Sequence, residues 1–505
     1  MRTGAVAFAV GVLTSACAAR TQLPAPLDLA RADDLTRQGC YTCLIDARAI
    51  YDRAGGAQRP ATRMRALEVE LLLVLREKEL SIDSTATMSR ARSIAEELPF
   101  SSNAAAALAL VEAVAPDVAG SQPSERRQPA FGIGSEGVAK ALETVEGVPL
   151  SPLFRAYLTT SVQCSGAGPA PSSPATPPSE PLLAYRAAFC RNAIDADALG
   201  ALRDAVPRFV EAALFQGRAA MGRIVGSDGS RARAFLEEAY AKFPRSSAVT
   251  LHLGTVHQAT GDCRRAHDYF TETLTLRPAH EAARLGRAIC RTYLSDFDGG
   301  VADATVLIDA VAGNRAEAYY WRAWIRRHLG QLDLARADIE RSRALLFNAR
   351  VLTLAGMIEH DQKDYEKAIE DLHQAHDVDP SECLAPWYLA LVGYATEHWT
   401  EAAKDFASAA ECYAGRVESS RKQKAAMTAR EDLEPAFRAR QMAGFDAAIA
   451  DDSAQKSAAD LNAALNYGRD GDIANATIYM KRAAADPQRR LAVDELRQVL
   501  RVPPW

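Results

Sequence analysis

The chain has 505 residues, more than one compact domain usually holds, so we expect two or three modules or one extended array. Hydrophobic residues make up 48% and charged residues 24%, as in ordinary folded proteins, and abundant alanine favours helix over strand. The net charge of −5 comes without a sustained basic stripe, which argues against nucleic-acid binding.

Residues 1–16 have the features of a signal peptide. A positive charge at Arg2 precedes the apolar run Ala5 to Leu13, which is too short for an ordinary membrane span. The following Leu13-Thr14-Ser15-Ala16-Cys17 resembles a bacterial lipobox, in which the cysteine is acylated and becomes the mature N-terminus. The resemblance implies lipidation of Cys17, and simple cleavage near Ala18 is the alternative.

Both alternatives predict export. Ala18 stands where an aspartate would favour retention in the inner membrane, so we expect an outer-membrane lipoprotein facing the periplasm. Because no later run of 18 apolar residues occurs, the membrane is expected to be contacted only through the N-terminal lipid anchor.

After a tether at 17–30, helical periodicity over 31–164 predicts a degenerate helical-repeat region. Cys40 and Cys43 within it predict a local disulfide or two packed thiols. Residues 165–181 contain six prolines and predict an extended linker, flanked by Cys164 and Cys190.

Residues 182–415 contain a pattern that recurs about every 34 residues. Units can be started at Ala213, Ser247, Glu281, Ala316, Ala349 and Cys383. The eighth residue of each unit is small: Ala220, Gly254, Ala288, Ala323, Gly356 and Ala390. The twentieth is small as well: Ala232, Ala266, Gly300, Ala335, Ala368 and Ala402. Two helix axes cross closely only where side chains are small, so each unit predicts a pair of antiparallel helices.

This pattern resembles the tetratricopeptide repeat, a helix–turn–helix unit of 34 residues. The resemblance implies an all-α fold, a right-handed solenoid of helix hairpins whose first helices line a concave groove. In that family the groove binds a protein or peptide. The groove positions of three units are expected to hold Tyr320, Trp324, Arg327, Arg350, Met357, His360, Trp387, Leu391 and Tyr394. The alternative is that Trp324 and Trp387 pack against neighbouring helices.

The repeat frame also suggests pairs of cysteines, because an exported chain meets an oxidising compartment. Cys263 and Cys290 fall on neighbouring helices of adjacent units, and Cys383 and Cys412 fall at the open end of one hairpin. We therefore predict the disulfides Cys263–Cys290 and Cys383–Cys412, with buried free thiols as the alternative.

Beyond the array, residues 416–456 predict a charged helical segment that includes one long, solvated helix from Glu418 to Arg440. Residues 457–505 predict a last repeat-like hairpin, with Gly471 at its turn, and a capping helix from Leu491 to Leu500.

The sequence contains no phosphate-binding loop with its lysine and no Gly-x-Ser-x-Gly elbow. We therefore expect no catalytic, metal or cofactor site. The predicted function is a non-enzymatic interaction scaffold of the bacterial cell envelope that binds a protein or peptide in its groove. One alternative is a structural subunit or assembly factor of an envelope complex, and another is an envelope enzyme or glycan binder that uses the N-terminal region.

Overall fold

The computed structural model describes residues 26–54, 60–98, 101–114, 143, 150–165, 180–190, 193–221, 229–310, 315–430 and 435–505. The predicted signal peptide at 1–16, Cys17 and most of the proline-rich stretch lie outside these ranges. The described residues form helices throughout, apart from a short antiparallel pair of strands, β1 (Phe189–Cys190) and β2 (Ala193–Ile194). None of the helices described is both long enough and apolar enough to span a membrane.

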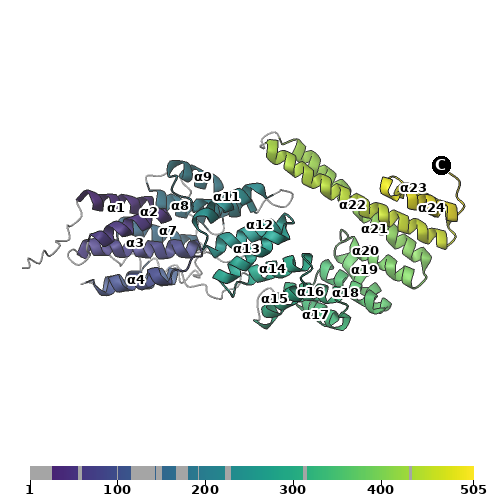
Figure 1. Cartoon of the computed structure of the whole chain (residues 1–505), viewed down its shortest axis with the longest axis horizontal. Helices are drawn as coiled ribbons and strands as arrows, with labels where there is room; N and C mark the ends of the chain where they lie inside the picture. Colours follow the sequence, from purple (N-terminus) through teal and green to yellow (C-terminus); the bar gives the residue numbers. More distant parts are fainter. Residues whose placement is uncertain are drawn as a thin grey trace, which may run out of the picture.

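The N-terminal part is a bundle of helices around a central, buried helix (Figure 1). Its helices are α1 (Pro26–Gln38), α2 (Tyr41–Arg53), α3 (Pro60–Glu79), α4 (Thr85–Glu96), α5 (Ser101–Val114), α7 (Pro152–Ser165), α8 (Pro181–Ala188) and α9 (Ala196–Ala205). In α3 every residue from Leu67 to Glu77 is buried, including charged ones. A helix buried on all sides needs internal partners for its charges, because an unpaired buried charge is costly.

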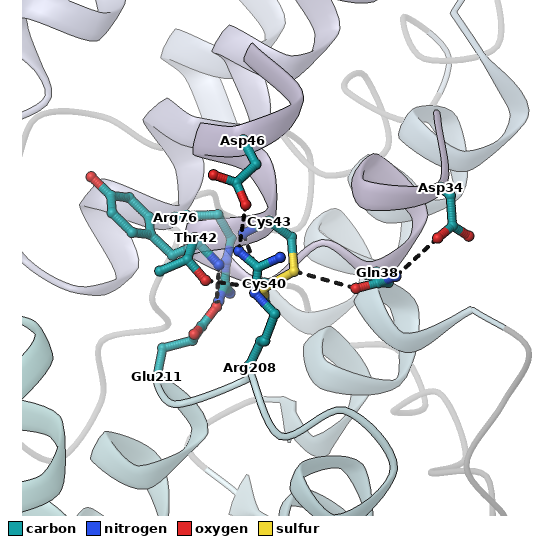
Figure 2. The surroundings of a disulfide bond; sticks show 10 residues. Asp34, Gln38, Cys40, Thr42, Cys43, Asp46, Arg76, Arg208 and Glu211 are labelled. Carbon is teal, nitrogen blue, oxygen red and sulfur yellow. Dashed lines mark hydrogen bonds and ion pairs between the residues drawn. A yellow bond between two sulfur atoms is a disulfide. The ribbon is translucent and has the colours of Figure 1, made fainter. Parts of the chain in front are cut away.

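Arg76 of α3 has such partners (Figure 2). Its guanidinium lies 2.6 Å from Glu211 and 2.5 Å from Glu79, and it is fully buried. Burial alone would lower the pKa of Arg76, but the neighbouring tyrosines and carboxylates raise it. The same Glu211 carboxylate accepts a hydrogen bond of 2.6 Å from the backbone N–H of Tyr41, at the start of α2.

A disulfide between Cys40 and Cys43 closes the turn into α2 beside this ion pair (Figure 2). Both cysteines are completely buried. The disulfide therefore has a structural position, inside the bundle, and not the exposure that a redox site needs.

The hydrophobic core is continuous from the bundle into the array. One cluster of buried residues extends from Ala32 to Val256, on both sides of the proline-rich stretch. Ser247, at the start of an array helix, donates a hydrogen bond of 3.1 Å from its hydroxyl to the carbonyl of Ser81. The expected linker at 165–181 therefore does not separate two independent cores, because α8 packs on both α1 and α7.

The array consists of consecutive hairpins stacked side by side (Figure 1). Its helices are α10 (Ala212–Met221), α11 (Ser230–Lys242), α12 (Ser247–Ala259), α13 (Cys263–Leu276), α14 (Glu281–Tyr293), α15 (Phe297–Asp309), α16 (Arg315–His328), α17 (Leu332–Leu345), α18 (Ala349–Gln362), α19 (Tyr365–Val378) and α20 (Leu384–Ala395). An all-α solenoid of helix hairpins is thus confirmed.

Small residues lie where the helices of each hairpin meet. Ala266, Ala335 and Ala368, each the twentieth residue of a unit, are fully buried. In the first unit the frame was wrong: Gly217, not Ala220, faces α11, where an added Cβ would lie 2.7 Å from Leu236. The reason is a longer connection between α10 and α11, which displaces the repeat frame by three residues.

A polar ladder that the sequence analysis missed joins successive hairpins. In the unit of α14 and α15, Arg287 and Arg291 bind Asp303 at 2.7 and 2.9 Å. In the next unit Arg322 and Arg326 bind Asp338 at 2.7 and 2.6 Å, at equivalent positions. Arg287 also donates to Thr271 of the preceding hairpin and Arg322 to Thr305, so each unit is bound to the one before it.

In the hairpin of α18 and α19, the polar ladder has an acidic residue where the two preceding hairpins have an arginine. Glu359 stands at the position of Arg291 and Arg326, and Asp371 at the position of the two aspartates. Arginines of the preceding unit supply the positive charge here: Arg336 lies 3.8 Å from Glu359, and Arg343 lies 2.9 Å from Asp371. Burial and the Asp371 carboxylate raise the pKa of Glu359 to about 7.

The C-terminal region is built on two long antiparallel helices, α21 (Trp399–Thr428) and α22 (Pro435–Arg469), which extend beyond the other hairpins (Figure 1). The single helix predicted from Glu418 to Arg440 is therefore wrong. Pro435 begins a second helix, since proline is accepted in a first helical turn but not in a helix interior. Gly471 lies at the predicted turn with φ +84°, followed by α23 (Ile473–Ala483), a short 3₁₀ helix at Pro487–Arg489, and α24 (Arg490–Val499).

The predicted cysteine pairs differ in outcome. Cys383 and Cys412 are joined by a disulfide between α20 and α21. The predicted Cys263–Cys290 disulfide is not formed: both are free thiols, although they are neighbours in one cluster. Burial and a hydrogen bond between the two thiols raise the pKa of Cys290, which keeps its sulfur protonated. The side chains of Cys164 and Cys190 are outside the described part of the chain.

Candidate partner-binding groove

The expected groove residues lie on α16, α18 and α20, and one arginine connects these three helices. Arg327 of α16 donates a hydrogen bond of 2.7 Å to Asp361 of α18 and one of 3.0 Å to the hydroxyl of Tyr388 on α20. His360 lies beside the same carboxylate, with Nδ1 3.1 Å from Asp361, and edge-on to the Tyr388 ring. Burial would raise the pKa of Asp361, but the hydrogen bonds from His360 and Arg327 lower it.

A second contact across the groove joins α16 to the start of α18. One guanidinium nitrogen of Arg350 donates hydrogen bonds of 2.7 Å to both carboxylate oxygens of Glu317. The same guanidinium lies 4.3 Å above the centre of the Tyr320 ring. Tyr320 is therefore 8% exposed and is covered by Arg350, so it supports the groove surface more than it forms it.

Trp324 is half-buried at the edge of this surface. Its ring stacks on His328 one turn later, with ring centres 3.6 Å apart. His328 is held in that position because its Nδ1 lies 2.9 Å from the Trp324 carbonyl oxygen. Met357, also half-buried, packs against the same cluster from α18.

Trp387 is half-buried, like Trp324, and packs against the helices that follow it. Its ring packs edge-on against Phe406 of α21 at 5.4 Å and against alanines of α21 and α22. Leu391 belongs to the same packed cluster. Here α22 occupies the place that the first helix of a further hairpin would take. Trp387 therefore packs against a neighbouring helix, which was the alternative to a place in the groove. Tyr394 is 39% exposed, and Arg469 of α22 lies 4.7 Å above its ring.

Sequence reasoning missed two aromatic residues, Trp321 and Tyr388. Each is the sixth residue of its unit, a position that the family pattern does not assign to the groove. Both units have an aromatic residue at this sixth position, and that recurrence could have indicated the two residues from the sequence.

Outside the array, a cavity of about 220 Å³ lies between α2, α3 and α4 in the bundle. Its charged wall residues already have partners: Arg63 with Glu97, and Arg90 with Asp52 and Glu70. Among the residues described, no group of three or more His, Cys, Asp or Glu side chains could hold a metal ion.

These features define an α-helical solenoid in which small residues allow successive hairpins to nest. The sequence model of the tetratricopeptide repeat matches residues 316–342 and 349–382, the hairpins α16–α17 and α18–α19. These two hairpins are therefore tetratricopeptide repeats.

Solved structures of repeat proteins are similar to parts of the chain. The C-terminal part of a TPR repeat-containing protein from Cytophaga hutchinsonii covers 55% of this chain and 98% of its own, at 15% identity and a TM-score of 0.37. MamA from Desulfovibrio magneticus RS-1 covers 34% and 96%, at 20% identity and 0.31. PilW, described as a type IV pilus biogenesis factor, covers 39% and 87%, at 18% identity and 0.33. No curated protein matches the sequence.

Proposed function

We propose that this chain is a non-enzymatic scaffold of the bacterial cell envelope that binds a protein or extended peptide along α16, α18 and α20. The observation that carries the proposal is the Arg327 network, in which one side chain fixes residues of three successive first helices. A surface held in place before binding loses little conformational freedom when a partner arrives, which favours affinity.

The location in the envelope rests on residues 1–17, with their export signal and lipobox-like sequence. If Cys17 is acylated, the chain is anchored to a membrane by lipid and the array faces the periplasm. Replacing Cys17 with Ser should move the protein from the membrane fraction to the soluble fraction. Unchanged partition of Cys17→Ser would contradict acylation.

The groove is tested by chemical cross-linking in isolated envelopes, identification of the captured partner by mass spectrometry, and binding of the purified partner to the full chain. Trp324→Ala and Arg327→Ala should each weaken that binding by about tenfold or more. Phe347→Ala is the matched control, because Phe347 is 56% exposed and is not one of the groove residues. Equal affinity for all three variants, with unchanged thermal stability, would rule out the groove.

A structural subunit or assembly factor remains the second candidate, because α21 and α22 extend beyond the array (Figure 1). Arg421 and Lys422 are exposed on that extension. If the captured partner instead tolerates Trp324→Ala but is lost with Arg421→Glu and Lys422→Glu together, the long hairpin is the binding surface.

A further inference from the structure

Five rings form a continuous strip on α14, α15 and α16, which we call the aromatic strip: Tyr293, Phe297, Trp321, Trp324 and His328. Ring centres are 6.1 Å apart between Tyr293 and Trp321, and 6.3 Å apart between Trp321 and Trp324. His328 stacks on Trp324 and lies 6.2 Å from Phe297. Of these five, Trp324 and His328 stand at groove positions of the repeat unit that contains α16.

The strip is accessible to a partner. Tyr293 is 66% exposed, His328 is exposed, and the other three rings are half-buried. The indole N–H of Trp321 is buried and has no hydrogen-bond partner among the described residues. The strip thus presents aromatic rings to a partner.

Three arginines beside the strip are paired with carboxylates of the chain. Arg291 binds Asp296 and Asp303, Arg326 binds Asp338, and Arg327 binds Asp361. These three positive charges are compensated within the chain, so they offer an acidic peptide less than free arginines would.

Proline suits this surface for two reasons. Its ring packs flat on an aromatic face, and it has no N–H that needs an acceptor. A polyproline II segment rises about 3.1 Å per residue, so two residues span the 6.1 Å between Tyr293 and Trp321 or the 6.3 Å between Trp321 and Trp324. Such a segment is already extended in solution and loses little entropy on binding.

We propose that the aromatic strip binds a proline-rich segment of a partner protein in the polyproline II conformation. The inference rests on the proposed function and specifies the class of partner. The strip extends the Arg327 network toward α14, so one extended segment can contact both.

The test is titration of the full chain with a labelled peptide of about twelve residues built from Pro-Pro-Ala triplets. A peptide of the same length with each proline replaced by serine is the control. Tryptophan fluorescence reports binding, because two of the strip rings are indoles. We expect the proline peptide to bind at least about tenfold more tightly than the serine peptide. Tyr293→Ala and Trp324→Ala should each weaken it by about tenfold, and Phe347→Ala should not.

Equal binding of the two peptides, or no effect of either strip variant, would overturn proline recognition. Saturable binding of an N-acetylglucosamine oligosaccharide that depends on Trp324, in place of the peptide, would also overturn it. The partner captured from envelopes distinguishes a failure of the proline assignment from a failure of the groove proposal. If Trp324→Ala releases that partner while the proline peptide does not bind, the groove stands and the proline assignment is wrong. If neither responds to the strip variants, both are wrong.

Discussion

The Phe270 ring packs against Gly286 of the next hairpin, where an added Cβ would lie 2.5 Å from the ring. The same ring lies against Gly254 of its own hairpin, where a Cβ would come within 2.7 Å. One side chain of α13 thus fills the space between α12 and α14, and two glycines in those helices provide the room. This three-helix contact explains why successive units of the array nest.

Gly286→Ala should therefore destabilise the chain by about 1–3 kcal/mol, although alanine favours helix more than glycine does. Gly415→Ala is the matched control: Gly415 is also helical, but nothing lies within 4 Å of its added Cβ, so a gain of about 0.5–1 kcal/mol is expected. Urea unfolding followed by circular dichroism measures both. Two variants of equal stability would refute the close contact.

Glu211→Ala should cost about 3–5 kcal/mol, because it removes a carboxylate from the fully buried Arg76 (Figure 2). Asp46 pairs with Arg208 nearby, but that pair is about half-exposed, so Asp46→Ala should cost less than about 1 kcal/mol. Thermal unfolding of both variants gives the comparison. A loss for Glu211→Ala no larger than for Asp46→Ala would mean that the buried pair adds nothing to stability.

Glu359 should make stability depend on pH. Its pKa is raised from the usual value of 4.5 to about 7, so the folded chain holds a proton that the unfolded chain releases. Its contribution is most favourable below about pH 4.5, declines as pH rises toward 7, and is constant above that value. Glu359→Gln should remove this part of the decline and raise stability at pH 8 by roughly 1–2 kcal/mol.

Melting temperatures between pH 5 and pH 8 test this expectation, with Glu366→Gln as control, since Glu366 is exposed on the same hairpin. The groups that face Glu359 are Asp371, Arg336, Asp364 and Glu340, and they are unchanged in both variants. Parallel curves for Glu359→Gln and the unaltered chain would show that Glu359 does not titrate in this range.

Cys383→Ser should lower the free energy of unfolding by about 3 kcal/mol, because the disulfide to Cys412 closes a loop across a separation of 29 residues. Cys263→Ser removes a free thiol and no loop, so its cost should be smaller. Denaturant midpoints under oxidising conditions compare the two. If a reductant lowers the midpoint of Cys383→Ser as much as that of the unaltered chain, this disulfide is not the stabilising one.

The helical array could be predicted from sequence because its determinant is local. Small residues such as Gly254 and Ala266 recur at fixed spacing, and their size alone permits the helices to cross. The frame was wrong in the first unit because a longer connection before α11 changes the count without changing the packing. The packing of Trp387 on α22 could not be predicted for a related reason, because α22 returns to the array only after the long hairpin that it forms with α21.

The polar ladder was present in the sequence but was not recognised. Arg287 and Arg322 each precede an aspartate by 16 residues, and the two sets lie 35 residues apart. What sequence could not supply is the pairing across units, such as Arg343 with Asp371, because it depends on how neighbouring hairpins dock.

The continuous core at the start of the array has a consequence for where the solenoid opens. Repeat arrays usually fray from their ends, but here the first hairpins share a core with the eight bundle helices described, and α20 is cross-linked to α21 through Cys383 and Cys412. Within the described hairpins from α12 to α19, the smallest apolar cluster is formed by Ala304, Leu307 and Ala318, where α15 meets α16. Amide protons of α15 should accordingly exchange with solvent sooner than those of α12 or α20, so breathing begins beside the aromatic strip and not at either end.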